Sequence, residues 1–265
     1  MWPVRLPGLA IAVACACGSS PTSPPSNSSA SPAQSATQPS SGPRDEARAL
    51  RDKILRVNPP VVILKNAATF AEYREVVRTA ESIEGVVAAA PFVFLELHIA
   101  SAGHAPLGVA VKGIDPQRAG SMRDLGAALK TGKLLDLAQG DPPALILGDQ
   151  LAELLGVHTG DRVVVTHPPQ AQPAGKPPRE YPFRVIGIMH TDIGVYDSYL
   201  AFASLAAAQQ IQDRGDQVMG LEVKVKDIDR SDEVARAIER ALGGMPYVAK
   251  DWFELNRELF GGRRP

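Results

Sequence analysis

The sequence predicts an α+β fold in which short strands and amphipathic helices alternate irregularly. Apolar runs typical of strands are intermixed with helically spaced apolar residues, without the regular strand–helix–strand spacing of a doubly wound sheet. Hydrophobic residues make up 45% of the chain and charged residues 22%, so a buried core can extend over most of its length. We expect a folded region at 44–260 with two subdomains, the middle one inserted at about 115–182, a protruding Pro-rich hairpin, and a short tail at 261–265.

Local signals define the elements of the first half. A helix is predicted over 45–56, where apolar residues recur at helical spacing until Asn58-Pro59-Pro60 ends it. A second helix is predicted over 69–83, with Thr69 as N-cap and Glu72 completing a capping box. Apolar runs bounded by turn residues predict strands at 61–64, 86–100 and 107–114, with a turn at 101–104 between the last two.

Glycines and short apolar runs define the elements of the second half. The segment 149–155 is predicted to be a helix that Gly156 closes as C-cap, and Ser204 is predicted to cap a helix that reaches Gln212. The alternating residues 221–226 predict a half-exposed strand. Further helices are predicted at 120–133, 231–242 and 251–260, and further strands at 144–147, 162–166, 183–189, 199–203 and 247–248.

The N-terminal segment 1–17 is predicted to be a targeting signal. A single positive charge, Arg5, precedes an apolar stretch that ends in small residues, which is the order of a secretory signal. The residues Ala12-Val13-Ala14-Cys15 resemble the lipobox of bacterial lipoproteins, so Cys15 is the predicted lipidation site and Cys17 the alternative. An ordinary cleaved signal peptide is the other interpretation. Ala16 is not the aspartate associated with inner-membrane retention, which favours the outer membrane.

The segment 18–43 is predicted to be a disordered tether. It is rich in Ser and Pro and contains no charged residue, so it cannot bury enough apolar surface to offset the entropy of ordering. The best remaining candidate for a membrane span, 86–97, is too short and contains Pro91 and Glu96. We therefore expect the mature protein to lie outside the cytoplasm, in the cell envelope, attached to a membrane through a lipid anchor only.

Composition excludes several classes of partner and site. The chain has 28 basic and 29 acidic residues, so it lacks the positive field that nucleic-acid binding requires. Its two cysteines, Cys15 and Cys17, both lie near the N-terminus, which excludes a disulfide framework and a cysteine-ligated zinc site from the folded region.

No catalytic motif is present, and we predict no enzyme activity, no cofactor and no metal site. The chain lacks GxSxG, GxxxxGK[ST] and GxGxxG, and its five histidines do not have metal-ligand spacing. A site shared by His158, His167 and His190 is the alternative to separate structural roles for each of them. Asp192 and Asp197 are interpreted as turn-forming and capping residues in preference to a functional carboxylate pair.

The loop 167–182 is the strongest candidate for contact with a partner. Prolines stiffen a loop and lower the entropic cost of ordering it when it docks. The predicted binding residues are Pro168, Pro169, Pro173, Lys176, Pro177, Pro178 and Arg179. A tolerated surface insertion is the alternative interpretation of this loop.

Six stretches carry a pattern that spans nearly all of residues 45–260: Leu50–Leu64, Gly85–Phe92, Val111–Pro116, Ala144–Val165, Phe183–Tyr196 and Asp251–Phe260. Each stretch alone is a weak signal, but their combination and order are specific. Together they resemble the periplasmic domain of lipoprotein-releasing ABC permeases of the LolC/LolE type, within the wider MacB-like periplasmic core domain family.

This resemblance implies an α+β periplasmic domain with no catalytic residues of its own. In the family, ATP hydrolysis occurs on a separate cytoplasmic subunit, and a proline-bearing hairpin that matches 167–182 engages the periplasmic lipoprotein carrier. The resembling permeases have membrane helices before the region matching 46–56 and after the region matching Phe260. Here the signal segment and tether precede this region, so we expect binding without active extrusion.

The hypothesis is therefore a non-enzymatic binding domain that engages a lipoprotein, its periplasmic carrier or a complex of ABC permease and ATPase. One alternative is a truncated or degenerate permease fragment without independent activity. A second alternative, from a different functional class, is a barrel-type secreted enzyme built on the helix–turn–strand unit at 148–165.

Overall fold

The computed structural model describes residues 43–118, 125–168, 178–262 and 264. Within them the strands form one sheet with the order β10-β1-β9-β2-β3-β8-β5-β7-β4, and β6 pairs with β2 and β7. The strands are β1 (Val61–Lys65), β2 (Val86–Ala100), β3 (Leu107–Ile114), β4 (Leu129–Thr131), β5 (Ala144–Gly148), β6 (Arg162–Thr166), β7 (Glu180–Met189), β8 (Leu200–Ser204), β9 (Gly220–Val225) and β10 (Tyr247–Asp251).

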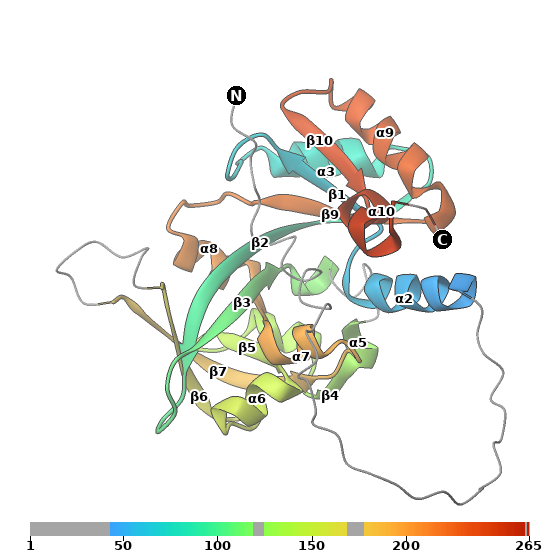
Figure 1. Ribbon diagram of the computed structural model, residues 1–265. Helices are drawn as coiled ribbons and strands as arrows, with labels where there is room; N and C mark the ends of the chain where they lie inside the picture. Colours follow the sequence, from blue (N-terminus) through green and yellow to red (C-terminus); the bar gives the residue numbers. More distant parts are fainter. Residues whose placement is uncertain (1–42, 119–124, 169–177, 263, 265) are drawn as a thin grey trace, which may run out of the picture.

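Helices pack around this sheet, which confirms the predicted α+β class (Figure 1). The α-helices are α2 (Pro43–Val57), α3 (Tyr73–Glu81), α5 (Leu125–Ala128), α6 (Asp149–Leu155), α7 (Gly194–Tyr199), α8 (Leu205–Gln212), α9 (Ser231–Ala241) and α10 (Trp252–Leu255). The 3₁₀ helices are η1 (Leu134–Ala138), η3 (Ile228–Arg230) and η4 (Arg257–Phe260).

The long strand β2 connects two parts of the molecule. Its first half pairs with β9, whereas its second half pairs antiparallel with β3 and, at its end, with β6. Figure 1 shows β2 as a curved strand that passes from the part containing β1, β9 and β10 to the part containing β5, β6 and β7. Each part has its own cluster of buried apolar side chains.

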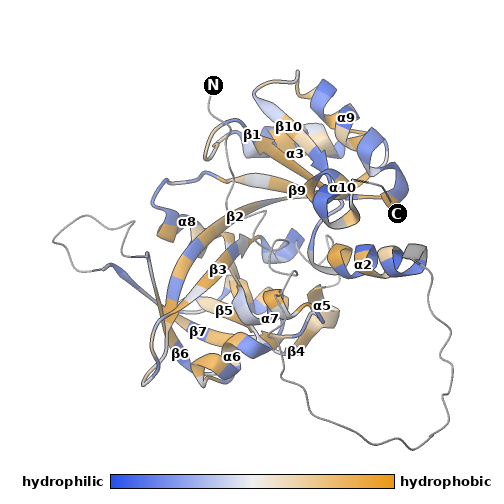
Figure 2. Ribbon diagram, viewed as in Figure 1, coloured by the Kyte–Doolittle hydropathy of each residue, from blue (hydrophilic) through white to orange (hydrophobic). Residues whose placement is uncertain are grey.

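The first core lies between two amphipathic helices and the β1–β9–β10 end of the sheet. In α3 the buried residues recur at helical spacing, as Val76, Val77 and Ala80 do, and α9 repeats the pattern at Val234 and Ile238. This spacing places one apolar stripe of each helix on the sheet. In Figure 2 α9 alternates between hydrophobic and hydrophilic segments, as a helix with one buried face does.

The second core contains residues from β2, β3 and β5 to β8, together with α6 and α8. The helix α6 ends as predicted at Gly156, which adopts the left-handed conformation with φ of 62° that favours glycine. The strands β4, β5 and β6 lie within the predicted inserted range 115–182. They pair with β7, β8 and β2, respectively, and these partner strands lie wholly or partly outside that range. The subdomain boundaries therefore stay a prediction.

The predicted capping box of the second helix is wrong. The helix α3 begins at Tyr73, and neither Thr69 nor Glu72 makes a capping hydrogen bond to it. Thr69 Oγ1 donates instead to Gln217 Oε1, because Phe70 forms an isolated bridge with Val218 and keeps the chain extended there.

Three further expectations need correction. Residues 129–131 form a strand and not the end of a helix, while 119–124 lie outside the described residues. The predicted last helix, 251–260, is split at Asn256 into α10 and η4. The helix α7 is an element that the sequence did not predict. The strand β9 is buried on both faces and not half-exposed, because its Glu222 forms an ion pair with Lys112 inside the protein.

The N-terminal predictions fall largely outside the described structure. Residues 1–42, including Cys15, Cys17 and nearly all of the predicted tether 18–43, are not described, and Pro43 begins α2. Among the residues that are described, no helix is both long enough and apolar enough to span a membrane.

Candidate functional site

The Pro-rich loop connects two neighbouring antiparallel strands. The last ladder pair of β6 and β7 is Thr166 with Glu180, so residues 180–182 belong to β7 and the connection is 167–179, shorter than predicted. Of the predicted binding residues, the structure describes Pro168, Pro178 and Arg179. Pro169, Pro173, Lys176 and Pro177 lie outside the described residues.

The base of this loop is anchored on the C-terminal end of α8. The His167 ring donates from Nε2 to the Ile211 carbonyl at 3.0 Å and packs edge-on against Tyr181. The Arg179 guanidinium lies 5.2 Å from the centre of the Tyr181 ring and 3.9 Å from the Asp213 carboxylate. Arg179 and Asp213 are both exposed, so this ion pair contributes little to stability and leaves Arg179 accessible to a partner.

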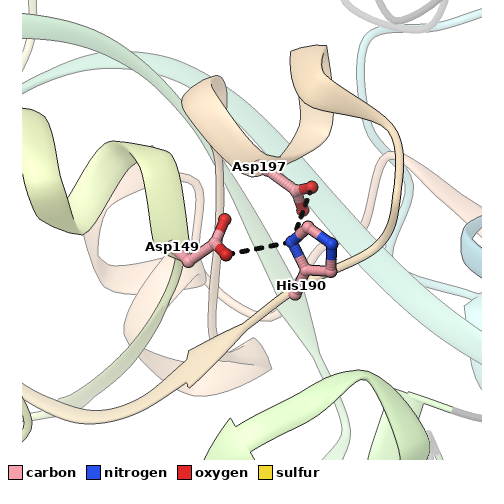
Figure 3. A group of neighbouring side chains, drawn as sticks. All are labelled: Asp149, His190 and Asp197. Carbon is pink, nitrogen blue, oxygen red and sulfur yellow. Dashed lines mark ion pairs between the residues drawn. The ribbon is translucent and has the colours of Figure 1, made fainter.

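A second candidate site lies where two parallel strands end. Gly148 of β5 pairs in parallel register with Met189 of β7, so the residues that follow them, Asp149 and His190, emerge side by side. The short helix α7 adds Asp197 to the same place. Figure 3 shows the two carboxylates directed at one nitrogen of the His190 ring.

The distances in this group are short. His190 Nδ1 lies 2.9 Å from Asp149 Oδ2 and 3.3 Å from Asp197 Oδ2. On the other side of the ring, Nε2 lies 3.1 Å from Asp192 Oδ1. Lys130 of β4 donates from Nζ to Asp149 Oδ2 at 2.6 Å. We refer to Asp149, His190 and Asp197 as the His190 cluster.

Local packing fixes Asp197. Its side chain is only 1% exposed, and its Oδ1 accepts hydrogen bonds from the Thr191 backbone nitrogen and hydroxyl, both at 2.8 Å. Gly148 makes room for α7, since a Cβ there would lie 2.2 Å from the Asp197 carbonyl oxygen. A side chain at position 148 would therefore displace the residue that supplies the buried carboxylate.

Opposing effects act on the pKa of Asp149. Burial raises it, but the hydrogen bond from Lys130 and the positive charges of Lys130 and His190 outweigh burial, so the pKa lies below its ordinary value. The hydrogen bond to Asp149 likewise raises the pKa of Lys130. Asp149 is therefore an anion at neutral pH.

The structure does not bring His158, His167 and His190 to a common set of partners. His158 pairs with Asp161, His167 with the Ile211 carbonyl, and His190 with aspartates. Asp192 has the left-handed conformation of a turn residue, with φ of 62°.

The sequence alone does not predict that Asp149 and His190 are neighbours, because each follows a separate apolar run and the two runs are far apart in the chain. Parallel pairing of β5 and β7 is the signal that would have joined them.

Comparison with known proteins adds a family and a fold. A family profile described as the MacB-like periplasmic core domain matches residues 34–241. Among curated proteins, the lipoprotein-releasing system transmembrane protein LolC of Neisseria meningitidis serogroup B is 32% identical over 213 residues, which cover 80% of this chain and 51% of that protein. LolC of Xylella fastidiosa strain 9a5c is 30% identical over 212 residues, covering 80% and 50%. The chain thus spans about half the length of the curated relatives it matches.

Two solved structures share the fold at low sequence identity. The periplasmic region of MacB from Actinobacillus actinomycetemcomitans superposes with a TM-score of 0.51 at 13% identity, covering 80% of this chain and 97% of that one. The extracellular domain of the noncanonic ABC-type transporter YknZ from Gram-positive bacteria gives a TM-score of 0.50 at 15% identity, covering 72% and 99%. At such identities the likeness concerns the fold alone.

Proposed function

Because the chain belongs to the MacB-like periplasmic core domain family, we propose that it is a periplasm-facing binding domain that takes part in lipoprotein transport. The observation that carries this proposal is the match to two LolC proteins, named for a lipoprotein-releasing system, over 80% of the chain. These relatives are named as transmembrane components of that system and not as enzymes, which supports a non-enzymatic role.

The contact surface that we propose is the loop 167–179, and its partner is the periplasmic lipoprotein carrier. The loop starts and ends on adjacent strands of one ladder, and His167 ties its base to α8. Six prolines at 168, 169, 173, 177, 178 and 182 reduce the conformations open to the free loop and its C-terminal flank, which lowers the entropic cost of docking. Lys176 and Arg179 give the loop a positive charge for an acidic partner surface.

Charge reversal tests this surface. The full chain carrying Lys176→Glu and Arg179→Glu is titrated with the purified carrier and compared with the unaltered chain. We expect affinity to fall at least about tenfold, which corresponds to about 1.4 kcal/mol. The matched control reverses two exposed cations at the opposite end of the sheet, Lys226→Glu and Arg240→Glu, and is expected to bind normally. Equal affinities for all three proteins would exclude the loop as the contact surface.

We also propose that the protein is attached to the outer membrane through a lipid on Cys15. The order of charge, apolar stretch, small residues and cysteine in 1–17 supports this. Cys15→Ser is expected to move the protein to the soluble periplasmic fraction, whereas Cys17→Ser leaves it with the membranes. Retention of Cys15→Ser on the membranes would contradict the proposed anchor.

The family relationship further supports a position next to a complex of ABC permease and ATPase. In that arrangement this chain supplies binding and the complex supplies the force from ATP hydrolysis. Co-purification of the tagged chain with an intact permease tests the association, and failure to recover any permease after mild cross-linking argues for the truncated-fragment alternative.

A further inference from the structure

We propose that Asp149, His190 and Asp197 bind a divalent first-row transition-metal ion, for which Zn²⁺ is the probe. Such a site is independent of the proposed binding function and differs from the sequence-based prediction of no metal site. One imidazole nitrogen and two carboxylate oxygens form a ligand set that such ions accept. These three atoms all lie within 4.8 Å of one another.

The spacing of the three atoms fits a coordination shell. Ligands placed about 2.0–2.2 Å from a Zn²⁺ ion lie roughly 2.8–3.1 Å from one another in octahedral geometry and roughly 3.3–3.6 Å in tetrahedral geometry. The observed separations from His190 Nδ1 are 2.9 Å to Asp149 Oδ2 and 3.3 Å to Asp197 Oδ2. Small side-chain adjustments would therefore suffice to admit the ion.

The buried oxygen Oδ2 of Asp197 accepts no hydrogen bond from the described part of the chain. In the described part of the chain, Asp197 Oδ2 and His190 Nδ1 make no hydrogen bond, although 3.3 Å separates them. A protonated His190 would form an ion pair with Asp197 at this distance, but the two groups are not aligned for a hydrogen bond. Burying a carboxylate oxygen without a donor is costly, and a coordinated cation removes that cost.

The tautomer of His190 also favours a cation. Asp192 Oδ1 can only accept, so at 3.1 Å from Nε2 it favours a proton on that nitrogen. In the neutral ring the lone pair of Nδ1 then faces the oxygens of Asp149 and Asp197, an arrangement that repels unless a cation lies between them. A carboxylate that orients a metal-binding histidine through its other nitrogen is a common feature of metal sites.

Charge and access are compatible with an exchangeable ion. The carboxyl groups of Asp149, Asp192 and Asp197 surround the His190 ring, and the Lys130 ammonium contacts the first of them. The His190 side chain is 40% exposed, but its Nδ1 atom is itself buried, so an ion must displace a neighbouring side chain to reach it. Lys130 contacts the same oxygen of Asp149 that the ion needs, but its side chain is 54% exposed and can turn away.

Calorimetric titration with Zn²⁺ tests the proposal. The full chain is used with Cys15→Ser and Cys17→Ser, so that thiolates cannot bind the ion. We expect one Zn²⁺ per chain, at least 100-fold weaker binding in His190→Gln, and unchanged binding in the control His158→Gln, which alters an exposed histidine outside the cluster. Lys130→Met removes the competing ammonium and is expected to tighten binding.

Two further measurements separate loss of ligation from loss of folding. Asp192→Asn keeps the three ligands and weakens the orientation of the ring, so it is expected to reduce affinity about tenfold without altering the circular dichroism spectrum. Co²⁺ bound in the cluster is expected to give visible absorption bands that His190→Gln abolishes. Absence of stoichiometric binding, or equal binding by His190→Gln, would overturn the proposal and leave a protonated His190 as the neutralising cation.

Discussion

The buried ion pair between Lys112 and Glu222 gives the most quantitative prediction. Lys112 lies on β3 and Glu222 on β9, on the two sides of β2, with their side chains 9% and 4% exposed. The Lys112 ammonium also lies 5.3 Å from the centre of the Phe92 ring. Together with Val62 and Tyr196 these residues line a pocket between the two parts of the sheet.

Removing one partner of this pair leaves the other charge buried without its counterion. Such a change costs about 3–5 kcal/mol, so Glu222→Leu and Lys112→Met are each expected to lower the free energy of unfolding by that amount. In the double variant no charge is stranded, and replacing a buried pair by apolar side chains is often neutral or stabilising, so we expect a change of at most about 1 kcal/mol. The coupling energy between the two positions is then at least about 5 kcal/mol.

Urea unfolding followed by circular dichroism and by tryptophan fluorescence measures these values. Coincident transitions with unchanged m-values permit the comparison of free energies. The matched control is Glu233→Leu at the exposed pair with Arg230, where the change is expected to stay within about 1 kcal/mol. A loss below about 1 kcal/mol in Glu222→Leu, or additive single variants, would refute the reasoning.

Two other predictions concern single positions. Gly148→Ala places a Cβ 2.2 Å from the Asp197 backbone oxygen, so it is expected to lower the free energy of unfolding in urea by about 1–3 kcal/mol. The control is Gly126→Ala, whose Cβ would meet no neighbouring group within 4 Å, and it is expected to be close to neutral. Hydrogen bonds from Lys65 and Tyr247 lower the pKa of Glu72 to about 2. Because the folded-state pKa is depressed, this stabilisation is complete above the ordinary pKa of 4.5 and disappears as the pH falls towards 2. Allowing for solvent screening of this partly exposed carboxylate, Glu72→Gln is expected to lose about 1–2 kcal/mol at pH 7 and almost nothing near pH 2.

Elements defined by neighbouring residues could be predicted from the sequence. The bounds of β2 and β3 were predicted correctly, because long apolar runs and a polar turn specify them locally. The helix α6 was also correct, since the apolar run and the left-handed glycine, Gly156, that closes it are local signals. The cap of α8 was correct for the same reason, with Ser204 accepting from the Ala207 backbone.

Features that depend on distant residues could not be predicted. Thr69 carried a capping signal, but its hydroxyl is bound by Gln217, almost 150 residues later in the chain. Glu222 appeared as the polar member of an alternating strand, and only the approach of Lys112 across β2 explains its burial. The His190 cluster joins residues from α6, from α7 and from the end of β7, which no local pattern links.

The central claim is that this MacB-like domain binds a lipoprotein carrier through the loop 167–179. The most direct measurement compares carrier affinity for the full chain and for a variant in which residues 169–177 are replaced by a Gly-Ser segment of equal length. We predict that binding is lost or falls at least about 100-fold while the urea midpoint is unchanged, because the β6–β7 ladder and the His167 contact at the base of the loop are left unaltered. Equal affinity in the two proteins would contradict the claim and move the binding surface elsewhere on the domain.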